Sequence, residues 1–283
     1  MPRIAMPLFG FECEQITDYQ FGDTGISIEQ FIEDDIVESP IFSQQDILHM
    51  KNEPGFAFIF ENENIEGYES LTNLLLMSFK IFCEIRSPLI KFRICRDDTS
   101  LCRLLNDTIS YNYSFPRPIR AYRLSEIEVI NEGFQALSDM DRISRRTHNA
   151  LYFLYRAFHS TKWMDAYILL MCSIESLFSK DKPGSATSAI TTRVSSLLNS
   201  RPQCTKKDIE DLYGIRSRII HGNIAGPRFD VEIKDRKANL KNLKHLEYVA
   251  IECFKEFAKN GLYRNYTDKS TRDDFLGTLD ITS

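Results

Sequence analysis

An arginine and a histidine lie five positions apart near the end of a predicted helix. Arg216 is followed by four residues and then by His221. A guanidinium group can hold a phosphate through a planar fork of donors. An imidazole has an unperturbed pKa of about 6.5, so it can accept and donate a proton near neutral pH. Together, these two groups could bind the phosphate and move the proton when RNA is cleaved by its own 2′-hydroxyl group.

The residues between them add to this chemistry. Ser217 contributes a hydroxyl group and Arg218 a second positive charge. A histidine at a helix C-terminus also has a common structural role, because its charge compensates the helix dipole. The pattern therefore leaves two interpretations of His221, a proton carrier and a helix cap.

Three ionic residues interrupt the apolar faces of three consecutive predicted helices. They are Glu175, Arg193 and Arg216. An unpaired buried charge costs several kcal/mol, so the three groups are predicted to meet in one buried network. Such a network could fix the register of the helices, or it could order a site that also contains His221.

The residues before and after Arg216 predict where its helix begins and ends. Thr205 and Asp208 have the spacing of a capping box, and Gly222 is a helix stop, so a helix is predicted over residues 205–220. Apolar residues at helical spacing predict the remaining helices of this half at 125–137, 144–159, 163–178, 186–198 and 231–259. Residues 263–283 show no clear periodicity.

The N-terminal half has a different pattern. Short apolar segments at 4–9, 25–31 and 55–60, and an alternating segment at 89–95, predict strands, and residues 68–84 predict a helix. Two prolines among polar residues make 106–122 the candidate linker. The predicted organisation is an α+β domain over 1–122, an all-helical domain over 123–265, and a tail over 266–283.

Composition and charge exclude several classes of protein. The chain has 283 residues, of which 43% are hydrophobic and 27% charged, and it lacks an apolar run long enough to span a membrane. Its seven cysteines show no zinc or redox spacing, which predicts a cytoplasmic protein without a metal or cofactor. Residues 1–140 carry a net charge of −12 and residues 141–283 a net charge of +7. The C-terminal half is therefore the one suited to a polyanion, and the alternative is that two solvated surfaces of opposite sign favour docking on each other.

Three segments in order resemble one family. DLYGIRSRIIHGN, residues 211–223, is similar to the active-site helix of HEPN domains, in particular of the Apea-like branch, whose motif is Arg, four to six residues, then His. DAYILLMCSIESLF resembles the core helix of that branch with its acidic residue at Glu175. AITTRVSSLL resembles the next helix, with its arginine at Arg193. The resemblance covers roughly residues 125–260.

The resemblance implies an all-helical bundle that forms a homodimer and often acts as a metal-independent endoribonuclease in toxin–antitoxin or antiphage systems. Arg216 would bind phosphate and His221 would transfer protons, while Glu175 and Arg193 would order the site. Active members often have Asn, Asp or His after the motif arginine, where this chain has Ser217.

The acidic N-terminal domain would then sense a trigger or bind an antitoxin. The alternative function is a non-catalytic module that binds RNA, a nucleotide or a protein partner.

Overall fold

The chain divides into two compact units. The computed structural model describes residues 3–37, 39–61, 65–83, 86, 88–104, 120–180, 186–224 and 233–280. One unit, the N-terminal unit, comprises Met1–Ile109 and Pro116–Gln135, and the other, the helical unit, comprises Ser110–Phe115 and Ala136–Ser283. The N-terminal unit contains an antiparallel sheet and the helical unit contains helices, which confirms the predicted α+β region followed by a helical one.

The sheet of the N-terminal unit has the order β2-β3-β4-β1-β6-β7, with β5 also paired to β1. The strands are β1 (Arg3–Phe9), β2 (Asp18–Gln20), β3 (Ile26–Gln30), β4 (Phe56–Glu61), β5 (Leu89–Ile90), β6 (Phe92–Cys95) and β7 (Arg103–Leu104). The strands predicted at 4–9, 25–31 and 55–60 are confirmed, and the one at 89–95 is divided into β5 and β6 at Lys91. Residues 4–9 of β1 are all buried, as expected for a central strand.

Helices cover this sheet. The short elements are η1 (Glu33–Asp35), α1 (Gln44–Asn52) and η2 (Thr99–Leu101), and the long helix is α2 (Ile65–Phe82). Phe79 of α2 packs against Phe58 of β4, with ring centroids 6.0 Å apart. At Gly133 of α3 (Leu124–Ile143), a Cβ atom would lie 2.2 Å from the ring of Phe82, so only glycine permits this approach.

The division between the units does not coincide with the linker predicted from the sequence. It falls after Gln135, within α3, which continues six residues beyond the predicted helix end. Residues 106–119 of the predicted linker lie outside the described residues. Tyr122, at its end, is buried in the N-terminal unit, where its backbone N–H donates to the carbonyl of Glu12 at 2.6 Å.

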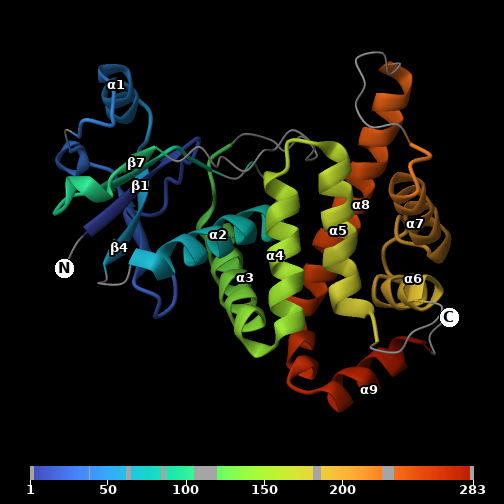
Figure 1. Cartoon of the computed structure of the whole chain (residues 1–283). Helices are drawn as coiled ribbons and strands as arrows, with labels where there is room; N and C mark the ends of the chain where they lie inside the picture. Colours follow the sequence, from blue (N-terminus) through green and yellow to red (C-terminus); the bar gives the residue numbers. More distant parts are fainter. Residues whose placement is uncertain are drawn as a thin grey trace. The chain divides into compact units, whose positions relative to one another are not determined.

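The helical unit is built around α5. Figure 1 shows α4 and α5 lying side by side, and α5 also contacts α7 and α8. The helices are α4 (Arg145–His159), α5 (Trp163–Phe178), α6 (Ala186–Leu197), α7 (Lys206–Ile220) and α8 (Ile233–Lys259), within two residues of their predicted bounds. Because α5 is surrounded by other helices, apolar residues occur nearly all round it.

The expected tail contains helices that pack on this bundle. After η4 (Leu262–Tyr266), α9 (Lys269–Asp280) lies against α6. Tyr266, Arg272 and Leu276 are buried. The sequence showed no periodicity here because α9 contributes few apolar residues, of which Phe275 packs against Phe257 and Leu276 is buried.

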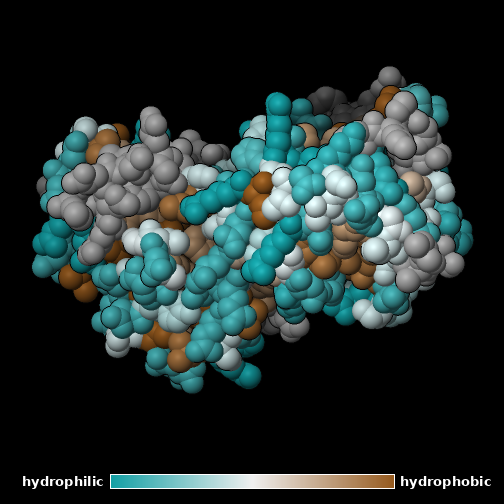
Figure 2. Space-filling model, turned by 90° about the horizontal axis from the view of Figure 1, so that it is seen from below, coloured by the Kyte–Doolittle hydropathy of each residue, from teal (hydrophilic) through white to brown (hydrophobic). Residues whose placement is uncertain are grey.

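The molecular surface is mainly hydrophilic on the face shown in Figure 2, where hydrophobic residues occur in small groups. Within the described ranges, no helix is both long enough and apolar enough to cross a membrane.

Candidate functional site

Local interactions at both ends of α7 position the motif. Thr205 and Asp208 form the predicted capping box, in which each side chain accepts a hydrogen bond from the backbone N–H of the other residue. At the other end, Gly222 has the left-handed φ of +71°, and the N–H of Asn223 donates to the carbonyl of Arg218 at 2.8 Å. The helix therefore begins and ends as predicted, and His221 occupies its C-cap.

Contacts with α5 hold α7 in place. The hydroxyl group of Tyr167 on α5 donates to the carbonyl of Leu212 at 2.7 Å, and both residues are buried. Ile209 and Ile215 of α7 are buried as well. This fixed register places Arg216 opposite Glu175.

Arg216 and Glu175 form an ion pair, as predicted. The Nη2 atom of Arg216 lies 3.3 Å from Oε1 and 3.4 Å from Oε2 of Glu175. The side chains are 33% and 27% exposed, so the pair is half-buried. Burial raises the pKa of Glu175 above its usual value although the positive charge of Arg216 opposes this shift. In the described chain, no other group accepts a hydrogen bond from Arg216, which leaves donors for a second anion.

Arg193 does not join this pair, so the prediction of a single network is wrong. Its Nε and Nη2 atoms donate to the two carboxylate oxygens of Asp280 at 2.8 and 3.0 Å, and Nη1 donates to the carbonyl of Phe178 at 2.6 Å. The physical reason is that α9, which the sequence pattern did not reveal, provides the carboxylate. Arg193 therefore connects α6, α9 and the end of α5, away from the motif.

Three of the predicted site residues lie exposed at the end of α7. They are Ser217, Arg218 and His221. The imidazole of His221 makes no hydrogen bond or ion pair within the described ranges, and it does not contact Arg216 or Glu175. The structure thus brings together Arg216 and Glu175 and leaves His221 exposed at the C-cap of α7.

Tyr213 belongs to the surroundings of the pair and was not predicted. It is buried, and its hydroxyl group has no hydrogen-bond partner among the described residues. Burial raises the pKa of this hydroxyl, and the negative charge of Glu175 raises it further. The signal in the sequence was its position three residues before Arg216, which places both residues on one helix face.

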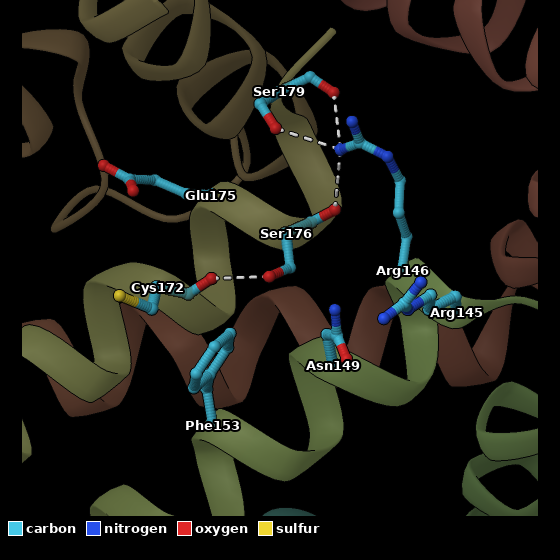
Figure 3. A pocket seen from close by; sticks show the side chains of 8 residues that line it. All are labelled: Arg145, Arg146, Asn149, Phe153, Cys172, Glu175, Ser176 and Ser179. Carbon is cyan, nitrogen blue, oxygen red and sulfur yellow. Dashed lines mark hydrogen bonds between the residues drawn. The ribbon is translucent and has the colours of Figure 1, made fainter. Parts of the chain in front are cut away.

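A pocket of about 410 Å³ lies between α4 and α5 (Figure 3). Its lining consists of Arg145, Arg146, Asn149, Phe153, Cys172, Glu175, Ser176 and Ser179. Nη1 of Arg146 donates to the backbone carbonyl and to Oγ of Ser179, both at 3.0 Å, which attaches α4 to the end of α5. Glu175 belongs to the lining of the pocket and also to the ion pair with Arg216, so the pocket and the pair share this residue.

Only Glu175 of this pocket was predicted from the sequence. Arg145, Asn149 and Phe153 recur every four residues on α4, which places them on one face. The four-residue spacing was the available signal for this side of the pocket. The prediction of the helix itself rested on the apolar residues of its opposite face.

Among the residues that the structure describes, no group of three or more His, Cys, Asp or Glu side chains is placed to hold a metal ion. Comparisons of the chain with protein-family models, with curated proteins and with solved structures found no match. The assignment of a function therefore rests on the side chains themselves.

Proposed function

We propose that the helical unit is an endoribonuclease of the HEPN type, of the Apea-like branch, that cleaves single-stranded RNA without a metal ion. The observation that supports this proposal most strongly is the incomplete pairing of Arg216. Glu175 orients its guanidinium through one nitrogen, and the remaining donors have no partner among the described residues. His221 lies exposed five residues further along, at the C-cap of α7.

The chemistry follows from these groups. Arg216 binds a non-bridging oxygen of the scissile phosphate and stabilises the charge that builds up there. The 2′-hydroxyl loses its proton to an imidazole, its oxygen attacks phosphorus, and the bond to the 5′-oxygen breaks. The leaving 5′-oxygen takes a proton. The products are a 2′,3′-cyclic phosphate and a 5′-hydroxyl group.

One imidazole cannot accept one proton and donate another in the same step. We therefore propose a homodimer in which the helical units bring two copies of His221 to one cleft. The exposed side chain of Ile220, 52% exposed beside His221, supports a contact at this end of α7. Closed two-fold symmetry is the commonest arrangement for such pairs.

The biological role that fits this chemistry is a toxin or antiphage effector that acts in the cytoplasm. The net charge of −12 over residues 1–140 suits a regulatory part that responds to a trigger or binds an antitoxin. The net charge of +7 over residues 141–283 suits the binding of RNA.

The second candidate function is a module of the same type that binds RNA, a nucleotide or a protein without cleaving anything. The observation that favours it is the lack of a contact between His221 and Arg216 within the described chain. In this candidate, Arg216 and Glu175 order the fold and His221 caps the helix.

Expression in cells separates the two candidates. The full chain, His221→Ala and a matched control, Asn223→Ala, are induced side by side, with growth and total RNA as readouts. Asn223 is exposed in the same loop and carries no titratable group. We expect growth arrest and RNA fragments from the wild type and the control only. Equal effects of all three chains would contradict a catalytic role of His221.

A further inference from the structure

The outer face of α4 combines positive charge with aromatic rings. Arg145, Tyr152 and Arg156 are exposed, and Asn149 and Phe153 are half-buried. These residues recur at spacings of three and four, so they form one stripe along the helix, called the α4 stripe below. Within the described ranges, neither Arg145 nor Arg156 forms an ion pair.

The two aromatic residues of the α4 stripe lie next to each other. The ring centroids of Tyr152 and Phe153 are 5.7 Å apart and their planes are inclined by 62°. Tyr152 is 50% exposed, which is unusual for so large a side chain in a helix that packs on a core. Flat aromatic faces of this kind stack on nucleobases of any sequence.

The α4 stripe enters the pocket between α4 and α5. Arg145, Asn149 and Phe153 form the α4 side of the pocket, and Glu175 lies on the α5 side (Figure 3). Glu175 also pairs with Arg216, so one residue links the pocket to the guanidinium that the proposed function assigns to the scissile phosphate.

The dimensions fit a chain of nucleotides rather than a small anion. Arg145 and Arg156 are eleven residues apart, which corresponds to about 16 Å along the helix axis and exceeds one nucleotide. The pocket, at about 410 Å³, falls within the range of small-molecule sites and accommodates a nucleobase. Guanidinium groups at both ends and aromatic rings between them are the combination that binds single strands.

We propose that the α4 stripe is a binding track for single-stranded RNA that leads to Glu175, the ion-pair partner of Arg216. Arg145 and Arg156 bind phosphates, Tyr152 and Phe153 stack on bases, and Asn149 donates to a base edge in the pocket. This inference rests on the proposed function for the position of the scissile phosphate, and the track itself requires no cleavage.

The test measures binding by the full chain, separately from cleavage. The probe is a fluorescent single-stranded oligonucleotide with 2′-O-methyl groups, which lacks the attacking hydroxyl. Loss of one stacking ring, in Tyr152→Ala or Phe153→Ala, should weaken its binding by about 5- to 100-fold. Arg145→Ala should weaken binding and reduce the dependence of affinity on salt, because each phosphate contact contributes about 0.7 to that slope for single strands.

Lys207→Ala is the matched control, since this lysine is 82% exposed on α7 and its removal changes the charge equally. It should bind the probe as the wild type does. Phe153 is half-buried, so thermal melting is recorded for every variant. If Phe153→Ala does not fold, the binding of the probe by Tyr152→Ala and Arg145→Ala decides whether the α4 stripe binds RNA, because both residues are exposed.

The outcomes separate the two proposals. If the wild type does not bind the probe, or if Tyr152→Ala and Arg145→Ala bind it as tightly as the control, the binding track is refuted, whether or not RNA is cleaved. If the variants lose affinity and the wild type cleaves no RNA, the track stands and the nuclease proposal fails.

Discussion

Glu175 contacts Arg216 through a single nitrogen of the guanidinium, and this incomplete pairing is the basis of the proposed chemistry. A fully buried bidentate pair would occupy one fork of the guanidinium and keep its other donors away from a phosphate. A solvated arginine without a partner would not be held in place. The half-buried pair avoids both problems, since Glu175 limits the positions of Arg216 while the N–H groups on Nε and Nη1 remain open.

Glu175→Gln tests this positioning role. Burial raises the pKa of Glu175, so its ionisation opposes folding: the contribution to stability is present at low pH and is lost as pH rises through the folded pKa. A glutamine has no charge to bury. The variant should therefore melt at or above the wild-type temperature at pH 7 and still cleave RNA more slowly. A large fall in melting temperature would show that the carboxylate stabilises the fold instead.

Variants of His221 and Arg216 should differ in their effects on the cleavage rate and on the affinity for RNA. His221→Ala should lower the cleavage rate by about 10²- to 10⁴-fold, the usual value of general acid–base transfer, and keep most RNA affinity. Arg216→Lys keeps the charge but loses the planar fork, so both rate and affinity should fall. Single-turnover cleavage and binding of a non-cleavable RNA measure the two effects. Cleavage by His221→Ala at the wild-type rate would exclude the proton-transfer role.

At the scale of elements, the helices around the site were predictable, whereas the shortest strands and the partner of Arg193 were not. The capping box at Thr205, the stop at Gly222 and the apolar periodicity are local signals, so α4 to α8 were predicted almost to the residue. β2 and β7 have three and two residues, too few for a pattern. The sequence also could not show that Arg193 pairs with Asp280, because that contact joins residues 87 positions apart.

The Arg193 and Asp280 pair should stabilise the helical unit. Burial alone would raise the pKa of Asp280, but hydrogen bonds and positive charge from Arg193 and Lys180 hold it below its usual value. This stability is present above the unfolded pKa and is lost as pH falls through the folded pKa. Asp280→Asn should cost about 1–3 kcal/mol at pH 7, because buried Arg193 loses charge-assisted hydrogen bonds.

Urea unfolding at pH 7 and at acid pH measures this contribution. Asp274→Asn, an exposed position on the same helix, is the control and should unfold like the wild type. The difference between Asp280→Asn and the wild type should shrink at acid pH. Equal unfolding midpoints at pH 7 would show that α9 is attached by other contacts.

At the scale of the whole molecule, α3 connects the two units without a break. Phe134 lies in the part of α3 that belongs to the N-terminal unit and packs there against Phe21, with ring centroids 6.1 Å apart. Removal of residues 1–122 would therefore expose an apolar face of α3. The regulatory role proposed for the N-terminal unit is better tested in the full chain than by truncation at the predicted linker.

The proposed dimer makes a prediction about mass. The chain has a mass of 32.9 kDa, so light scattering at micromolar concentration should give about twice this value. Ile220→Glu, which places a charge on the exposed residue beside His221, should weaken the dimer and lower cleavage together. A monomeric wild type that cleaves RNA at full rate would contradict a shared active site.

The most direct test of the nuclease proposal is the chemistry of the RNA ends. The purified full chain is incubated with a random-sequence single-stranded RNA in the presence of EDTA, and the termini of the products are determined. We predict 2′,3′-cyclic phosphates and 5′-hydroxyl groups, which depend on His221 and are not formed from the 2′-O-methyl analogue. Products with 5′-phosphates, or the same cyclic ends from His221→Ala, would contradict the proposed mechanism.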